Sequence, residues 1–310
     1  MSQIGDSGTR IKVGLELRQS WFINAFFLNS EALHNVLKKD MDPIISLDKY
    51  LLQQIVGAHS KVAIEYLYLE TATIPPDYIL SSRRVNYLHN IISRSDSELV
   101  KHVFNVQKEN CSKGDWCDIV KQDMALINLS MSEKEIAEYS KREFKAIVKK
   151  HLTSAAFESL KLKQSGHIKI KHIKYQNNKV QPYLKSNLFS SEESATLFNL
   201  RSNTVNGYKM CFPSVYRNDK SCKLGCLVDD SIDHLYTCLI IDKSCGKTKT
   251  RFIGVYASLP EQKEAASIFI KRHNTRSSII EAVTASQGPR QILDTSTQAD
   301  AGGAGASTGG

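Results

Sequence analysis

The strongest constraint on the fold is a cluster of cysteine and histidine residues in the last third of the chain. It reads Cys-x3-Cys-x7-His-x3-Cys, and its spaced residues are Cys222, Cys226, His234 and Cys238. Separations of two to five residues let one tight turn present two ligands to a tetrahedral ion. The segment therefore predicts two ligand pairs that converge on one metal.

Local sequence supports this interpretation of the cluster. Gly225 precedes Cys226, at a point where a tight turn favours a residue that tolerates positive φ. A helical turn over Ser231 to Cys238 would place His234 and Cys238 four residues apart on one face. Four protein ligands leave no open position for water or substrate, so we expect a structural zinc ion and not a catalytic one.

The remaining cysteines leave alternatives open. The chain has seven cysteines, an odd number that fits a disulfide framework poorly and indicates a reducing compartment. Cys211 and Cys245 are substitute ligands or bystander thiols, and Cys111 and Cys117 are weaker candidates for a second site. Chance clustering of thiols in a hydrophobic core is the competing interpretation of the main cluster.

Hydrophobic periodicity predicts helix along most of the chain. We expect one helix over Asp42–Ala58, which Gly57 would end, and a second that starts after Pro75-Pro76. Three more are expected: one behind the capping box of Ser132 and Glu135, one after Ser190, and one over Leu259–Ala285. Arg83 and Arg84 would lie near solvent on the second of these helices. Gln164–Lys185 is interpreted as a linker or a short strand, because apolar and basic residues alternate over part of it. The tail Gln287–Gly310 is rich in small and polar residues and is expected to be disordered.

Positive charge is concentrated in one tract. The formal net charge of the chain is +9, and the tract from Lys141 to Lys185 has 12 Lys and Arg residues against two acids, Glu143 and Glu158. The rest of the chain is close to neutral. Such a tract indicates an acidic partner such as nucleic acid, although a solvated helix face would look the same.

Several classes of protein find no support in the sequence. It contains no phosphate-binding loop, no nucleophile elbow and no His-Glu-x-x-His helix, and the adjacent acidic residues Asp229-Asp230 are interpreted as a solvated turn. No apolar run approaches the length of a membrane span, and Met1–Lys12 lacks the apolar core of a signal peptide. We therefore expect an intracellular, soluble protein without a membrane or small-molecule partner.

A series of segments resembles the reverse transcriptases of non-LTR (LINE-type) retrotransposons, in the part that follows the polymerase palm. They occur in the family's order and lead to the zinc cluster, so the resemblance covers roughly Leu17 to Cys238. The segments are LRQSWFINAFFLNSEAL, YLLQQIVGAHS, IEYLYLETATIPPDYILSSRRVNYLHNIISR, KGDWCDIVKQDM and LFNLRSNT. Any one of them alone would be weak.

The resemblance implies a helical, thumb-like region and a zinc knuckle. Arg83 and Arg84 match the paired arginines of a family segment, which implies phosphate contacts that give affinity without reading sequence. The cluster differs from the commonest knuckle, which has two residues between the first cysteines and four between the histidine and the last cysteine. Here both separations are three.

The palm with its catalytic aspartates and the endonuclease domain have no counterpart in the matched segments. The expected protein is therefore no enzyme by itself. It would be a truncated copy of an element, a fragment of a gene prediction or a remnant adopted by a host, and these three remain open.

The predicted organisation is mostly α. It consists of a thumb-like region (1–130), a basic connector (131–205), a zinc-knuckle-like unit (206–245), a helical segment (246–286) and a disordered tail (287–310). Nucleic acid would be contacted by Arg83, Arg84, Lys145, Lys149, Lys150, Lys169, Lys171, Lys174 and Lys223. Tyr236 would stack on a base or pack locally.

The expected partners are RNA, DNA or both, in a nuclear or cytoplasmic ribonucleoprotein. The alternatives are a helical scaffold with a structural zinc ion and only protein partners, and an inert remnant.

Overall fold

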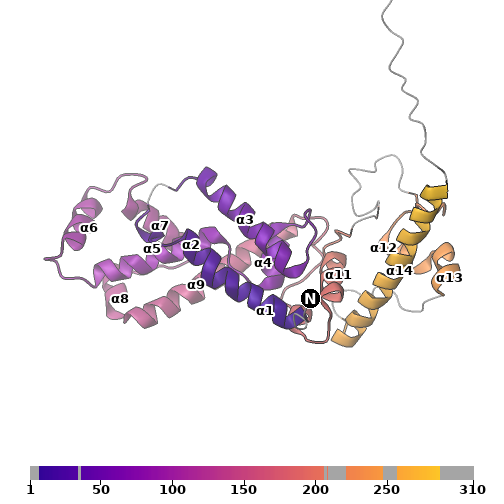
Figure 1. The fold of residues 1–310 in the computed structure, drawn as a ribbon. Helices are drawn as coiled ribbons and strands as arrows, with labels where there is room; N and C mark the ends of the chain where they lie inside the picture. Colours follow the sequence, from indigo (N-terminus) through magenta and orange to yellow (C-terminus); the bar gives the residue numbers. More distant parts are fainter. Residues whose placement is uncertain (1–6, 34–35, 206–207, 209–220, 247–256, 287–310) are drawn as a thin grey trace, which may run out of the picture.

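The computed structural model describes residues 7–33, 36–205, 208, 221–246 and 257–286. These residues form helices and turns, and among them there is no strand, only an isolated antiparallel bridge between Ser221 and Asp229. The predicted mostly helical fold is therefore confirmed. Figure 1 shows an elongated molecule, with α6 to α8 at one end and α12 to α14 at the other.

The helices follow one another in two groups. The first comprises α1 (Ser7–Leu17), the π-helix η1 (Arg18–Ile23), α2 (Asn24–Phe26), the 3-10 helix η2 (Ser30–Ala32), α3 (Lys38–Val56), α4 (Ile64–Thr71), α5 (Pro76–Ile92), α6 (Leu99–Glu109) and α7 (Trp116–Leu126). The second comprises α8 (Glu133–Glu138), α9 (Lys141–Ser165), α10 (Pro182–Lys185), α11 (Ser191–Arg201), α12 (Ile232–Thr237), α13 (Leu239–Cys245) and α14 (Leu259–Ser286).

Helix ends lie largely where the sequence predicts them. Gly57 ends α3 with a φ of 70°, and Pro76 is the first residue of α5. Ser132 forms the predicted capping box with Glu135. The helix behind it is two helices, because Tyr139 is extended and a second capping box, formed by Ser140 and Glu143, starts α9.

Two larger hydrophobic cores, and a small cluster around Ile23 and Phe27, stabilise the part of the molecule before residue 200. One lies among α1, α3, α4, α10 and α11, and the other among α5 to α8. Helix α9 contributes to both, with Leu152 and Ala156 in the second core and Phe157 and Leu160 in the first. The predicted boundary at residues 130 and 131 therefore does not separate two hydrophobic cores.

A third core joins the metal-cluster segment to the helices on either side of it. Leu200 of α11, Tyr236 of α12, Ile241 of α13 and Phe269 of α14 belong to the same cluster as Cys222. The predicted boundary between a zinc unit and a separate C-terminal helical segment therefore crosses this core.

Buried charges tie the helices of the first core together. Both Arg18 Nε and Arg18 Nη2 bond the Asp48 carboxylate at 2.6 Å, and the hydroxyl of Tyr68 donates to the same carboxylate. Glu70 on α4 accepts hydrogen bonds from Arg201 at 2.9 Å and from the hydroxyls of Tyr175 and Tyr183, both at 2.6 Å. Each buried carboxylate is thus neutralised by an arginine, as the low polarity of an interior requires.

The segment interpreted as a linker or strand is instead folded into turns. Ile170 and Ile173 are buried in the first core, whereas Ile168 lies in solvent. The side-chain amide of Gln164 donates to the carbonyls of Ile170 and Ile173, at 2.7 and 2.8 Å. These bonds satisfy carbonyl groups that a strand would have paired with a neighbouring strand.

Two expectations fall on residues that the structure does not describe, namely the tail 287–310 and Cys211. Among the described helices, none has the length and apolar character needed to cross a membrane.

Candidate metal centre and nucleic-acid interface

The first two predicted ligands lie on one tight turn. The amide of Cys222 donates to the carbonyl of Val228 at 2.9 Å, and the amide of Gly225 donates to that of Cys222 at 3.0 Å. Gly225 has a φ of 84°, which confirms the reason for a glycine before Cys226. The amide of Leu224 points at the sulfur of Cys222, 3.5 Å away, as a donor to a thiolate would.

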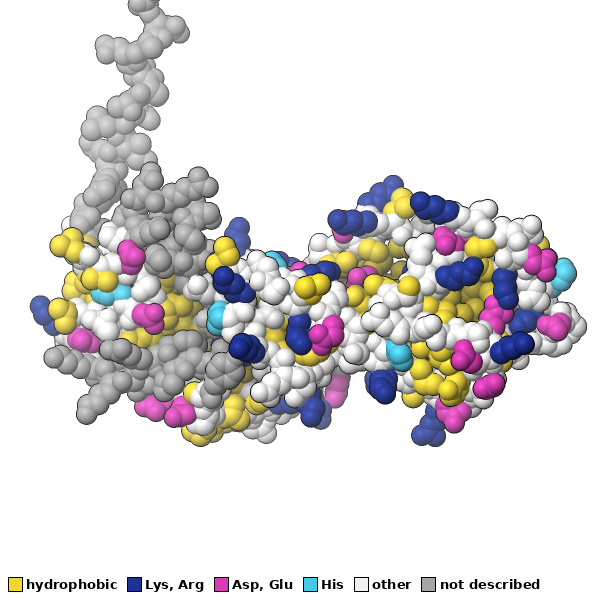
Figure 2. All heavy atoms as spheres, turned by 180° about the vertical axis from the view of Figure 1, so that it is seen from behind, with side chains coloured by type: hydrophobic (Ala, Val, Ile, Leu, Met, Phe, Trp, Pro, Cys, Tyr) yellow, Lys and Arg dark blue, Asp and Glu magenta, His cyan; other side chains and the backbone are white. Residues whose placement is uncertain are grey.

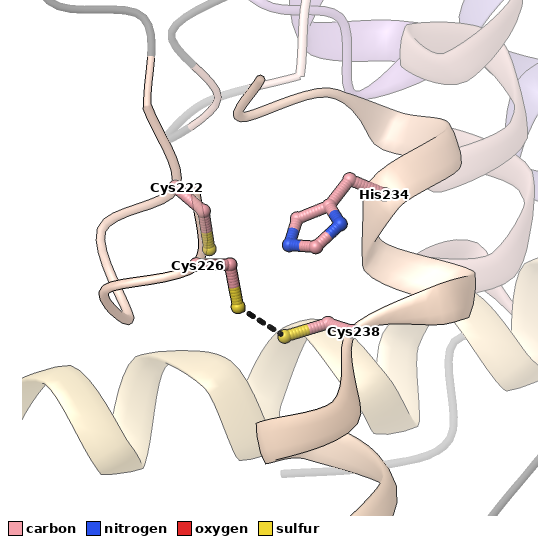
Figure 3. A group of neighbouring side chains, drawn as sticks. All are labelled: Cys222, Cys226, His234 and Cys238. Atoms are coloured by element: carbon pink, nitrogen blue, oxygen red, sulfur yellow. Dashed lines mark hydrogen bonds between the residues drawn. The ribbon is translucent and has the colours of Figure 1, made fainter. Parts of the chain in front are cut away.

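The second two ligands lie at the two ends of α12. Ser231 caps this helix, and its hydroxyl accepts a hydrogen bond from the amide of His234 at 3.0 Å. Cys238 follows directly after the last helical residue. In Figure 3 the side chains of His234 and Cys238 point toward those of Cys222 and Cys226 on the turn.

The four residues together could hold a metal ion. One ligand atom from each of them lies within 4.8 Å of all the others. The sulfurs of Cys226 and Cys238 are 3.7 Å apart, close to the distance of about 3.8 Å expected for two thiolates on a tetrahedral ion with bonds of about 2.3 Å. Nε2 of His234 is buried and has no hydrogen-bond partner, so a cation would satisfy it.

Burial and neighbouring groups shift the pKa values of two of the candidate ligands. Burial and the neighbouring thiol of Cys238 raise the pKa of Cys226 to about 12. Burial lowers the pKa of His234, and Arg276 lowers it further, against the opposite effect of Asp230. The imidazole is thus held neutral, which is the form that binds metals.

Two buried arginines of α14 fasten the ligand-bearing segments to that helix. Arg276 Nη2 bonds both carboxylate oxygens of Asp230, at 2.8 and 2.9 Å. Arg272 donates to the carbonyls of Leu235 and Gly246 and to the carboxylate of Asp242, the last at 2.7 Å. The interpretation of Asp229-Asp230 as a solvated turn is therefore wrong for Asp230, because its side chain is only 1% exposed and is paired.

No sequence motif marks these two arginines as parts of the site. Arg276 and Asp230 are 46 residues apart in the chain, so no local pattern links them. Tyr236 is also part of this attachment, since it is buried and its hydroxyl donates to the carbonyl of Ala265 on α14. It packs locally, and its ring is not available for stacking on a base.

The other described cysteines do not belong to the group of four candidate ligands. No second group with metal-binding geometry occurs among the described residues. Cys117 is buried and its thiol faces the amide oxygen of Gln107, while Cys245 lies 3.8 Å from Nη1 of Arg272. Cys111 is partly exposed.

The two arginines of α5 differ in their surroundings. Arg84 is 7% exposed and forms a buried pair with Asp123, with Nη2 2.9 Å from Oδ1. Its predicted position near solvent is wrong, because the carboxylate on α7 draws it into the core. Arg83 is half-buried and donates to the carbonyl of Phe27 and the amide oxygen of Asn24.

The lysines predicted to contact nucleic acid are mostly exposed. Lys145, Lys149 and Lys150 lie on the solvent side of α9, and Lys171 and Lys174 lie on the turns that follow it. None of these five forms an ion pair with another described residue. Lys223 is exposed on the ligand-bearing turn, whereas Lys169 is half-buried.

Charge is not segregated on the face drawn in Figure 2. Lysine and arginine side chains are spread over that face, with acidic side chains among them. A nucleic-acid interface would therefore depend on particular exposed elements, above all α9, and not on one continuous basic surface.

Comparisons with known proteins add no assignment. No protein-family model matches the chain, and searches of curated proteins and of solved structures found no match. The resemblance to a retrotransposon reverse transcriptase stays a prediction.

Proposed function

We propose that this chain is a nucleic-acid-binding segment of a retrotransposon reverse transcriptase, with a structural zinc ion and without polymerase activity of its own. The observation that carries the proposal is the group of exposed lysines Lys145, Lys149 and Lys150 on α9, none of which forms an ion pair with another described residue. Lysines of this kind bind phosphates and release counterions, which gives affinity for RNA or DNA without sequence reading.

The donor set favours zinc in the proposed centre. Three thiolates and one imidazole at tetrahedral separations are ligands of structural zinc sites. Cys222, Cys226, His234 and Cys238 would hold the ion, and its charge would stabilise the thiolates. The closed site would shape the turn that carries Lys223 and would perform no chemistry.

Arg84 is left out of the proposed interface, because its guanidinium is paired inside the protein. The proposed contacts are Lys145, Lys149, Lys150, Lys171 and Lys174, with Arg83, Lys169 and Lys223 as secondary contacts. The proposed location is an intracellular ribonucleoprotein.

Titration of salt tests the interface on α9. Binding of a labelled RNA–DNA duplex and of single-stranded RNA would be measured for the zinc-loaded full chain and for the variant Lys145→Gln/Lys149→Gln. We expect the slope of log affinity against log salt to become shallower by about 1 for each lysine removed. The matched control is Lys121→Gln/Lys134→Gln, which removes two exposed lysines of α7 and α8 and should leave the slope unchanged.

A second candidate is a helical scaffold with only protein partners. It is favoured by the attachment of the metal centre to α14 through Arg272 and Arg276. These contacts are made within the chain, so the centre has a structural role without any nucleic acid. Absent or salt-insensitive binding by a folded, zinc-loaded chain would reject the nucleic-acid proposal and leave the scaffold.

A further inference from the structure

One pocket at the end of the basic tract has lysines as its only charged lining residues. It has a volume of about 490 Å³ and is formed by the turns after α9 and by α10. Three of its lining residues are lysines, namely Lys174, Lys179 and Lys185, and none of them is acidic. This volume lies within the range of about 300 to 1,000 Å³ typical of sites for small ligands.

The charge of these lysines is not compensated within the fold. All three are exposed, and none forms an ion pair with another described residue. Glu70, which is hydrogen-bonded to this segment, does not compensate them, because its carboxylate is buried and already paired with Arg201 at 2.9 Å. Bringing three ammonium groups to one pocket costs free energy by like-charge repulsion, which an anion would relieve.

The walls of the pocket are fixed by buried hydrogen bonds. The hydroxyls of Tyr175 and Tyr183 donate to the two carboxylate oxygens of Glu70, and the amide of Gln181 donates to the carbonyl of Glu70 at 2.9 Å. Burial and then the charge of Glu70 raise the pKa of both tyrosines well above 10, so both stay hydrogen-bond donors. These bonds hold the backbone that carries the pocket lysines in place before a ligand binds.

Neutral side chains make up the rest of the lining, and three of them are amides. Gln176, Asn177 and Gln181 carry amides that both donate and accept hydrogen bonds. A ligand suited to this lining has a compact group with more than one negative charge and polar atoms beside it. A phosphate monoester carries about 1.5 to 2 negative charges at neutral pH, whereas each internal phosphodiester of a strand carries only one.

We infer that this pocket binds a terminal phosphate monoester, such as the phosphorylated end of an RNA or DNA strand held on α9. The assignment of the phosphate to a nucleic-acid strand rests on the proposed function, whereas the pocket and its charge are independent of it. Lys179 and Lys185 would then be ligand-binding residues beyond the proposed interface, and Lys174 would belong to both.

The experiment compares two short single-stranded RNAs of the same sequence, one with a 5′-phosphate and one with a 5′-hydroxyl. The full-length, zinc-loaded chain is expected to bind the phosphorylated RNA about tenfold more tightly, because charge-assisted hydrogen bonds to the dianion are formed only there. In Lys179→Gln/Lys185→Gln the preference should disappear, while affinity for the hydroxyl-ended RNA changes less than about twofold. Lys121→Gln/Lys134→Gln is again the matched control, and circular dichroism checks that each variant is folded.

The outcomes separate this inference from the proposed function. Equal binding of both RNAs by the unaltered chain, or an equal loss for both RNAs in the pocket variant, overturns the pocket and leaves the interface on α9. If neither RNA binds, calorimetry with uridine monophosphate and with inorganic phosphate tests the pocket independently of the proposed function. Binding of one of these two compounds by the unaltered chain, and not by the pocket variant, supports a phosphate-binding pocket whose ligand is a free anion. If neither compound binds the unaltered chain, the pocket is overturned.

Discussion

At the scale of single residues, Glu70 is a buried carboxylate that joins three distant parts of the chain. It is fully buried, it pairs with Arg201, and it accepts hydrogen bonds from the hydroxyls of two tyrosines in the segment that follows α9. One side chain of α4 thus fixes α11 and the turns around α10. The sequence gives no sign of this role, because the partners lie 105 to 131 residues away.

Replacement of this carboxylate is therefore expected to be severe. Glu70→Gln keeps the size of the side chain but leaves the Arg201 charge buried without a counterion, and such a loss typically costs about 3 to 5 kcal/mol. Urea denaturation followed by circular dichroism measures the free energy of unfolding. The control is Glu158→Gln, which breaks only the exposed pair with Lys161 and should cost less than about 1 kcal/mol. Similar small losses in both variants would show that Glu70 is not a central contact.

At the scale of helices and turns, α9 connects the two larger cores and carries the proposed interface. Its apolar face contributes Phe144, Val148 and Leu152 to one core and Phe157 and Leu160 to the other. The opposite face presents lysines to solvent. The start of this helix is fixed by Ser140, whose hydroxyl accepts from the amide of Glu143 while the Glu143 carboxylate accepts from the amide of Ser140.

Removal of this cap should weaken the helix by a measurable amount. Ser140→Ala is expected to lower the free energy of unfolding by about 1 kcal/mol, because an amide at the first turn loses its partner. Ser154→Ala, an exposed serine inside the same helix, is the control and should be neutral or slightly stabilising. Thermal unfolding of both variants gives the comparison, and equal midpoints would contradict the role of the cap.

At the scale of the whole molecule, the metal centre belongs to a core of its own that α11 and α14 share. The first two cores contain none of the four ligands. Metal removal should therefore affect the chain unevenly, since the ligands fix the turn and α12 but not the helices before residue 200.

Chelation provides the test of this separation. We expect one zinc ion per chain in the purified protein by elemental analysis, and loss of that ion in Cys238→Ser. Hydrogen exchange should then accelerate in α12 and α13 and in the face of α14 that contacts them, while α4, α5 and α9 remain protected. Uniform acceleration through all helices would show that the metal supports the entire fold. Unchanged exchange after zinc has been removed would show that the metal has no structural role.

Part of this structure can be predicted from short stretches of sequence. The end of α3 and the limits of α5, α11 and α14 follow from apolar periodicity, proline, glycine and capping residues, each of which acts within a few positions. The predicted start of α3 at Asp42 is wrong, because the helix begins at Lys38, where the Asp40 carboxylate accepts a hydrogen bond from the amide of Leu37, and Pro43 lies inside it. The four candidate ligands follow from spacing for the same reason, since a turn and one short helix suffice to bring them together.

Other features depend on partners that are distant in the chain and were decided only by tertiary packing. The side chain of Arg84 was expected near solvent, but Asp123, 39 residues away, pairs with it inside the protein. The segment with an alternating pattern became buried turns because Gln164 satisfies its carbonyls. The sequence by itself determined the helices and the ligand set, because their interactions are local; the tertiary structure decided which charges are neutralised and which stay free to bind, because that depends on which side chains the packing of distant helices brings together.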